Sequence, residues 1–327
     1  MTDAPEVSVI IPSFKTTKYI GAAIESVLAQ TFGSFEIIVV SDGCPDTSAL
    51  EELMRSYSSR VRYIWQPNKG TAGARNTAIR AARGTWIVQL DADDMLDPTC
   101  LESQVRMMRE HPEFDAVYCN SFNFADSPEA AAVWGEHSGR YYMEVSPSSG
   151  PVSFTSIVDA RTSPRVLGSI IRRDTLLRIG LHDESKPMAE DLDLWLRMLK
   201  ADPPGQIGYT SESLGRYRLR TDNATLNGEG EERLLSALEK AGRTLDLTAA
   251  ERACLDRRLR ENRFDAEVAR GRKAVREGRW KDAVQNYKYC HEYSGSRKYS
   301  VVLMLLRTFP WGMPMGMWVW DRLRGRA

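Results

Sequence analysis

The sequence of 327 residues lacks the marks of several large classes of protein. Its five cysteines are scattered along the chain and never form a CxxC pair, which argues against a disulfide framework or a zinc site and favours a reducing cytosol. Basic and acidic side chains number 44 each, so a formal net charge of zero provides no general basic field for nucleic acid. We therefore expect no nucleic-acid partner.

Long apolar segments are also absent. No run of about 18 or more uninterrupted apolar residues occurs, so no conventional membrane-spanning helix is expected. Residues 1–6 hold no basic cluster and no apolar core, so no signal peptide is expected. These absences favour a cytoplasmic location, with the inner face of the cell membrane as the alternative. The length allows one large domain with an appendage, or two domains.

Apolar runs that predict strands alternate with helical patterns through residues 1–118. The strands are predicted at residues 7–11, 35–40, 61–64 and 86–90. Such alternation about every 30 residues predicts an α/β fold, with a mostly parallel sheet flanked by helices on both faces. The carboxyl ends of parallel strands lie on one edge of the sheet, where open α/β sheets bind ligands.

The last of these strands is followed by Asp91-Ala92-Asp93-Asp94. Asp91 and Asp93 are two residues apart, which on an extended chain places both carboxylates on one side. Such carboxylates repel each other unless a cation lies between them, and a divalent ion such as Mg²⁺ or Mn²⁺, shared with phosphate, fits that need. An acidic turn is the plainer alternative.

Three other strand ends carry polar residues: Pro12-Ser13, Asp42-Gly43, and the loop from Asn68 to Arg75. Asp42 can accept hydrogen bonds from a base or a ribose, or simply form a turn. Arg75 can pair with a carboxylate or a phosphate, or lie on the surface. Neither GxGxxG nor GxxxxGK[ST] occurs here, so neither the dinucleotide nor the P-loop fingerprint is present.

Together these motifs resemble the family-2 glycosyltransferases with the GT-A fold, over about residues 5–225. The resemblance is carried by residues 7–12, Gln30-Thr31 before Phe35-Glu36, residues 40–43, Asn68-x-Gly70-x-x-x-Ala74-Arg75-Asn76, and residues 90–94. It implies a nucleoside-diphosphate sugar as donor, a nucleotide-binding half at residues 1–118 and an acceptor half at residues 119–225. Asp42 would hold the base, Asp91 would face the ribose and diphosphate, and Asp93 would ligate the metal.

By the same resemblance, the donor-binding positions extend along the whole edge. The expected donor-binding residues are Pro12, Ser13, Asp42, Asn68, Gly70, Arg75, Asp91, Ala92, Asp93, Arg218 and Arg220, with Asp93 and Asp91 as metal ligands.

The acceptor half is less regular. Residues 120–165 are rich in Ser, Pro, Gly and aromatic side chains, which indicates either an acceptor-binding segment or an ordinary insertion. Glu190 and Asp191 open a predicted helix, where carboxylates are stabilised and often merely cap the end. The resemblance assigns Asp191 as the general base and Glu190 as a residue that positions the acceptor. One displacement would then invert the anomeric centre, without a covalent nucleophile.

Residues 215–220 resemble the family's Tyr-Arg-x-His element, with Arg220 in place of His. Arginine stays protonated and cannot bind a metal. Either the metal loses a protein ligand or Arg220 meets the diphosphate directly. The Gln-x-x-Arg-Trp element of processive synthases is absent, so we expect one sugar to be added per event.

Residues 226–327 are expected to be helical. Thr248 and Glu251 form a predicted capping box, and residues 279–287 resemble half of a tetratricopeptide unit. The Met- and Trp-rich stretch at residues 301–326 ends in three arginines, which favours contact with a membrane surface. A helix buried on the domain or in a homodimer is the alternative. Membrane contact would suit a lipid-linked acceptor; a free glycan is the other class.

Two other functions compete with glycosyl transfer in polysaccharide or glycolipid synthesis. A nucleotidyltransferase would need a Gly-rich phosphate loop after the first strand, where this chain has Ser13-Phe14-Lys15-Thr16. A non-catalytic scaffold that binds nucleotide sugars is suggested by Arg220. The sequence does not identify the sugar, the nucleotide or the acceptor.

Overall fold

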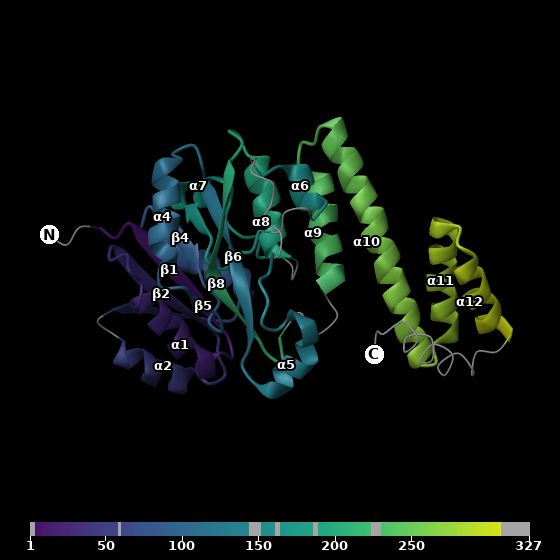
Figure 1. Ribbon diagram of the computed structural model, residues 1–327, viewed down its shortest axis with the longest axis horizontal. Helices are drawn as coiled ribbons and strands as arrows, with labels where there is room; N and C mark the ends of the chain where they lie inside the picture. The colour runs from purple at the N-terminus through teal and green to yellow at the C-terminus, as the bar shows by residue number, and fades with distance from the viewer. Residues whose placement is uncertain are drawn as a thin grey trace. The chain divides into compact units, whose positions relative to one another are not determined.

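The computed structural model describes residues 4–57, 60–143, 152–160, 164–185, 189–223 and 230–308. The chain forms two units, residues 1–252 and residues 253–327 (Figure 1). The boundary predicted at residue 225, where the family resemblance ends and the helical C-terminal region begins, stays a prediction. Helix α9 (Gly230–Thr244), which follows that division, belongs to the first unit and contacts α8 (Glu190–Leu199).

The first unit is built on one sheet of eight strands in the order β3-β2-β1-β4-β7-β6-β8-β5. The four strands at one end are parallel, as predicted, whereas β7 is antiparallel to both β4 and β6, and β5 is antiparallel to β8. The strands are β1 (Val7–Ser13), β2 (Phe35–Asp42), β3 (Val61–Gln66), β4 (Trp86–Gln89), β5 (Met95–Leu96), β6 (Ala116–Ala125), β7 (Ile170–Arg172) and β8 (Ile207–Leu219).

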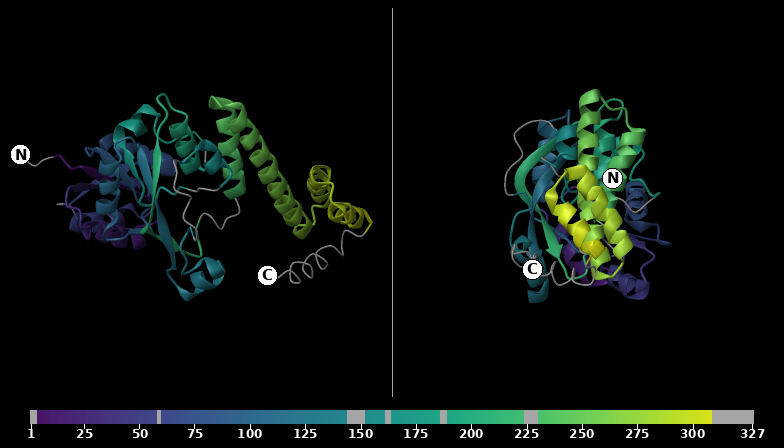
Figure 2. Two further views of the ribbon diagram at one scale, coloured as in Figure 1. Left: turned by 45° about the horizontal axis from the view of Figure 1, so that its top comes forward. Right: turned by 90° about the vertical axis from the view of Figure 1, so that its right-hand side faces the viewer.

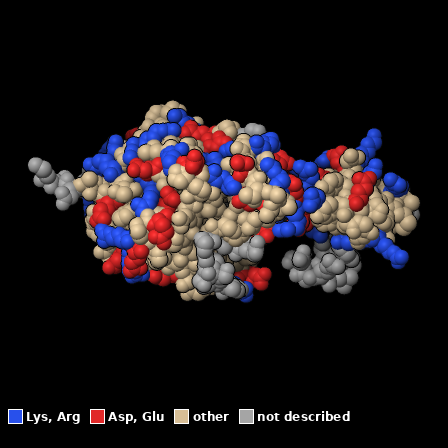
Figure 3. Space-filling view, turned by 90° about the horizontal axis from the view of Figure 1, so that it is seen from above, with Lys and Arg blue, Asp and Glu red and all other residues tan. Residues whose placement is uncertain are grey.

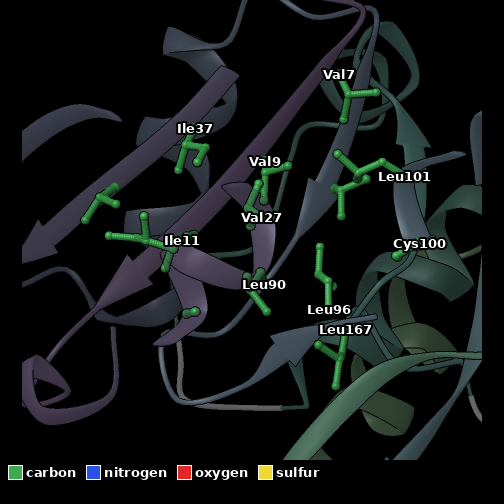
Figure 4. Close-up of a cluster of buried hydrophobic side chains, with 14 of the residues drawn as sticks. Val7, Val9, Ile11, Val27, Ile37, Leu90, Leu96, Cys100, Leu101 and Leu167 are labelled. Atoms are coloured by element: carbon green, nitrogen blue, oxygen red, sulfur yellow. The ribbon is translucent and has the colours of Figure 1, made fainter. Parts of the chain in front are cut away.

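Helices cover both faces of the parallel strands, which is why these strands read as continuous apolar runs. On one face, Val9 of β1 and Ile37 of β2 pack with Val27 and Leu101 from two helices (Figure 4). On the other face, α3 contacts β1 and β2, and Ile10 is fully buried. The helices before α8 are α1 (Thr17–Leu28), α2 (Thr47–Ser56), α3 (Gly70–Ala81), α4 (Cys100–Glu110), α5 (Pro128–Trp134), η1 (Gly135–His137), α6 (Phe154–Val158) and α7 (Arg173–Arg178).

Residues 119–225, the expected acceptor half, are more regular than the sequence indicated. Strand β6 continues past residue 118 to Ala125, and it pairs in parallel with β8 along its whole length, with a bulge at residues 119–121. Asn120 and Ser121 are polar yet buried in this ladder, so their chemistry concealed the strand. Asp174 lies in the first turn of α7, and Arg172 occupies the cap position of that helix.

The second unit contains most of α10 (Ala249–Arg276), together with α11 (Trp280–Ser294) and α12 (Arg297–Thr308). Figure 2 shows α11 and α12 side by side, and their core includes Tyr287, Cys290 and Leu306. The predicted capping box is present at the start of α10: the Thr248 amide donates to Glu251 (2.8 Å) and the Glu251 amide donates to Thr248 (3.3 Å).

Within the described residues, no helix is both long and apolar enough to cross a bilayer. Most of the Met- and Trp-rich tail, residues 309–327, lies outside the described residues. Basic and acidic side chains are interspersed over the face shown in Figure 3, in keeping with the balanced composition.

Candidate active site

The polar ends of β1, β2 and β4 meet at one edge of the sheet and line a cavity of about 340 Å³. Helices α3 and α8 and the end of β8 close its other sides. The predicted residues among its lining are Pro12, Ser13, Asp42, Arg75, Asp91, Ala92, Asp93, Glu190 and Arg220. Asn68 and Gly70 line an adjoining cavity of about 460 Å³ that shares Glu190. Asp191 and Arg218 line neither cavity.

Arg75 joins the two sides of this cleft. The residue is 2% exposed, and its guanidinium lies between the end of β4 and the start of α8. Nη2 donates to Asp91 Oδ1 (2.8 Å), and Nη1 donates to Glu190 Oε1 (3.2 Å) and Asp191 Oδ1 (3.1 Å). Asp91 and Asp191, one hundred positions apart in the sequence, therefore lie around one side chain.

Burial and charge shift the pKa values of this group in opposite directions. Burial lowers the pKa of Arg75, but the carboxylates of Asp91, Asp191 and Glu190 more than offset this and raise it, so Arg75 stays charged. Burial raises the pKa of Asp191 to about 7; Glu190 and Asp91 act in the same direction, and Arg75 opposes them. A carboxyl group titrating near neutrality can exchange protons with a bound hydroxyl.

The turn after β4 is held by two arginines, Arg218 near the end of β8 and Arg220 just after it. Arg220 Nη2 lies 3.0 Å from Asp93 Oδ2, inside the cleft. Arg218 instead donates from Nε to the Asp93 carbonyl (2.6 Å), and its amide donates to the buried Asp94 Oδ1 (2.8 Å). Burial raises the pKa of Asp93, with Asp91 adding and Arg220 opposing. Arg218 thus supports the turn, and its predicted contact with a donor stays untested.

The carboxylates of Asp91 and Asp93 fit a shared metal site but not a closed one. Among the residues that the structure describes, no group of three or more His, Cys, Asp or Glu side chains could hold a metal ion. Arg75 and Arg220 also pair with these two carboxylates. Mg²⁺ is commonly held by one or two carboxylates and completed by substrate phosphates and water, and this donor set matches that pattern.

Asp42 is fixed in place before any ligand arrives. Its Oδ1 accepts from Gln66 Nε2 (2.6 Å) and the Lys69 amide (2.9 Å), and Asn68 Nδ2 donates to its carbonyl (3.0 Å). Gly43 follows with φ +65°, and a Cβ there would lie 2.7 Å from the Asn68 nitrogen. Only glycine fits this close approach without strain. Asp42 therefore lies at the edge of the cleft, and its contact with a base stays a prediction.

Several residues of the cleft were missed as site residues. Asn76 ties α3 to the segment before α8, because Nδ2 donates to the His182 carbonyl (2.8 Å) and Glu184 Oε1 (2.7 Å) while Oδ1 accepts from the His182 amide (2.9 Å). Its place beside Arg75 in the motif was the available signal. Asn223, whose Oδ1 accepts from the Arg220 amide (2.6 Å), had no sequence signal. Tyr217 and Arg233 also line the cavity.

Comparison with known proteins agrees with this architecture. The family described as Glycosyl transferase family 2 matches residues 8–146. An uncharacterized glycosyltransferase of Rickettsia typhi is 30% identical over 236 residues, which are 69% of this chain and 69% of that protein. The crystal structure of S. aureus TarS 1-349 with UDP-GlcNAc has a TM-score of 0.62 at 18% identity, covering 93% of this chain and 87% of that one.

A second solved structure, the mannosyltransferase PcManGT from Pyrobaculum calidifontis in complex with GDP-Man and Mn²⁺, has a TM-score of 0.59 at 15% identity. It covers 97% of this chain and 84% of that one. The fold is thus the GT-A fold, a mixed α/β sheet flanked by helices, as predicted. The chain belongs to glycosyltransferase family 2, and it is a glycosyltransferase.

Proposed function

We propose that this enzyme transfers one sugar from a nucleoside-diphosphate sugar to an acceptor hydroxyl, in a single inverting displacement with Asp191 as general base. The observation that carries the proposal is the contact of Arg75 with both Asp91 and Asp191, at 2.8 and 3.1 Å. It supports a cleft in which a donor bound at the strand ends meets a base at the start of α8. The nucleotide sugars bound to TarS and PcManGT support the same class of donor.

Each side chain has a distinct role in this mechanism. Asp42 accepts hydrogen bonds from the base, and the edge formed by Pro12, Ser13 and Ala92 holds the nucleoside. Asp191 takes the proton of the attacking hydroxyl while Glu190 orients the acceptor. Asp93 and Asp91 would hold a Mn²⁺ or Mg²⁺ ion, which would supply positive charge for the leaving diphosphate.

Arginine side chains would also supply positive charge near the leaving diphosphate. Arg220 pairs with Asp93 at 3.0 Å, so it can contact phosphate oxygens beside the metal ligand. Arg75 keeps Asp91 and Asp191 at fixed positions. An acceptor carrying several hydroxyl groups, either a free glycan or a lipid-linked one, is expected, in polysaccharide or glycolipid synthesis.

Helix α12 supports a location at the inner membrane surface. Val301 and Met304, three residues apart and on one face, are 49% and 56% exposed. The helix contains Arg297, Lys298 and Arg307 and no acidic residue. An apolar stripe flanked by cations suits anionic lipid, and a homodimer contact is the alternative. Flotation with anionic vesicles should recover the full-length protein but much less of a chain ending at Tyr299; equal recovery would reject membrane docking.

Nucleotide binding and turnover test the proposed function. The midpoint of thermal unfolding should rise with one of UDP, GDP or dTDP in the presence of Mn²⁺, because ligand binding stabilises the native state. The matching nucleotide sugar should then be slowly hydrolysed or transferred. If no nucleotide raises the midpoint, the donor assignment is wrong. Binding without any turnover would favour the scaffold.

A further inference from the structure

A second cavity of about 530 Å³ lies next to the cleft, and the proposed mechanism does not use it. Tyr217 lines both cavities, which makes them neighbours. The wall of the second cavity is also tied to the cleft, because Trp134 Nε1 donates to the Arg220 carbonyl (2.9 Å). A molecule bound in the second cavity would therefore lie beside the donor.

The walls of this cavity are aromatic. Trp134, Tyr141, Tyr142 and Tyr217 line it, and Tyr141 is 55% exposed while packing edge-on against Phe122. Flat apolar rings with polar edges match a sugar, whose ring presents C–H faces and a rim of hydroxyl groups. The lining thus favours a carbohydrate over a wholly apolar ligand.

Arg165 adds a positive charge. Its guanidinium carbon lies 3.4 Å from the centre of the Tyr142 ring and 4.4 Å from that of Tyr217. Among the residues that the structure describes, Nη1 makes two long contacts, each 3.4 Å, to the neutral oxygens of Ser121 and Asn123. Within the described residues, no carboxylate lies at ion-pair distance from Arg165, although burial raises the pKa of the buried Asp94 and the charge of Arg165 acts to lower it. A half-buried guanidinium stacked on aromatic rings is oriented by them and retains N–H groups for an anion.

The remaining charges leave the cavity basic. Arg140 and Arg165 line it together with His137, and Glu136 is the acid among its lining residues. A carboxylate or phosphate on a sugar could make a charge-assisted pair with Arg165 that a neutral sugar cannot.

We propose that this second cavity binds the acceptor, and that the acceptor is an acidic glycan whose carboxylate or phosphate pairs with Arg165. The inference rests on the proposed function, because it takes the sugar bound beside the donor to be the acceptor. It adds the chemical class of the acceptor and a residue that selects it.

Saturation-transfer NMR on the full-length protein tests this selectivity. The probes are methyl β-D-glucuronide, glucose 6-phosphate and the neutral methyl β-D-glucoside. At least one acidic sugar should bind about tenfold more tightly than the neutral one, as expected for a charge-assisted hydrogen bond. The two acidic probes separate a carboxylate acceptor from a phosphate acceptor. Equal binding of all three, or binding by none, would overturn the proposal.

Variants connect the selectivity to Arg165. R165Q should abolish the preference for acidic sugars, R165K should retain part of it, and R55Q, which removes an exposed arginine on α2, should leave it unchanged. A preference unaltered in R165Q would also overturn the proposal.

The nucleotide-dependent rise in unfolding midpoint, measured on the same proteins, distinguishes a failure of the acceptor-site proposal from a failure of the proposed function. R165Q should retain that rise. If R165Q loses the preference for acidic sugars but keeps the nucleotide-dependent rise in midpoint, the acceptor site is supported. A wild-type protein that prefers acidic sugars but shows no rise with any nucleotide would count against the proposed function instead.

Discussion

The proposed donor side and the proposed acceptor side of the cleft are assembled in different ways. On the donor side, the side chains follow the ends of β1, β2 and β4, whose parallel register brings Ser13 beside Ser41. On the acceptor side, β6 pairs with β8, which lies about 90 residues later in the sequence. Trp134 donates a hydrogen bond to the carbonyl of Arg220. The donor side is thus encoded in short local motifs, and the acceptor side depends on distant partners. Arg75 belongs to both, since it contacts Asp91 and α8.

The largest effect should come from the base. Asp191→Asn keeps the shape of the side chain but cannot take a proton, so turnover should fall by about 10³-fold. Nucleotide affinity should change little, because the donor side is intact. Steady-state kinetics and calorimetry would measure the two. Asp174→Asn is a matched control, an exposed acid in the first turn of α7. Turnover within about fivefold of the parent would remove Asp191 from the proton transfer.

A second substitution should change only the metal-dependent binding of the nucleotide. Asp93→Asn should weaken binding of the matching nucleoside diphosphate in Mn²⁺ by at least about tenfold, as loss of a metal-site residue does. In excess chelator, affinity should be the same as that of the parent. Asp222→Asn is the control, since Asp222 also lies near Arg220 (3.5 Å) but its side chain is 75% exposed. Equal losses with and without metal would show that Asp93 does not bind the ion.

The pH dependence of turnover should be set by Asp191 and modified by its neighbour Glu190. Asp191 must be ionised to act, so its pKa of about 7 predicts that turnover falls as pH drops through neutrality. Glu190 contributes to the raised pKa of Asp191, so Glu190→Gln should move this acid limb to lower pH, with rates expressed relative to each plateau. A shift to higher pH, or a limb unchanged in Asp191→Asn, would assign the titration to another group.

The difference between local motifs and distant partners explains which parts of the fold and of the site could be predicted from the sequence. The strand ends of the donor side were predicted because short apolar runs are followed by Asp42 after one intervening residue and by Asp91 directly. Strand β8 was missed because its polar residues follow no apolar alternation, and its pairing with β6 supplies what the pattern lacks. Arg165 gave no signal, since its proposed role depends on two tyrosines that the fold brings together.

The smallest effect should separate two arginines that the sequence treats alike. Arg218 and Arg220 were both expected at the donor, but Arg218 bonds the Asp93 carbonyl and stacks near Phe124 (4.7 Å). Arg218→Gln should therefore cost about 1–3 kcal/mol of stability, seen in urea unfolding, through loss of a charged hydrogen bond. It should lower nucleotide affinity less than Arg220→Gln does. If Arg218→Gln instead weakened the nucleotide as much as Arg220→Gln with stability unchanged, its guanidinium would have to reach the donor. The turn after β4 would then rearrange on binding.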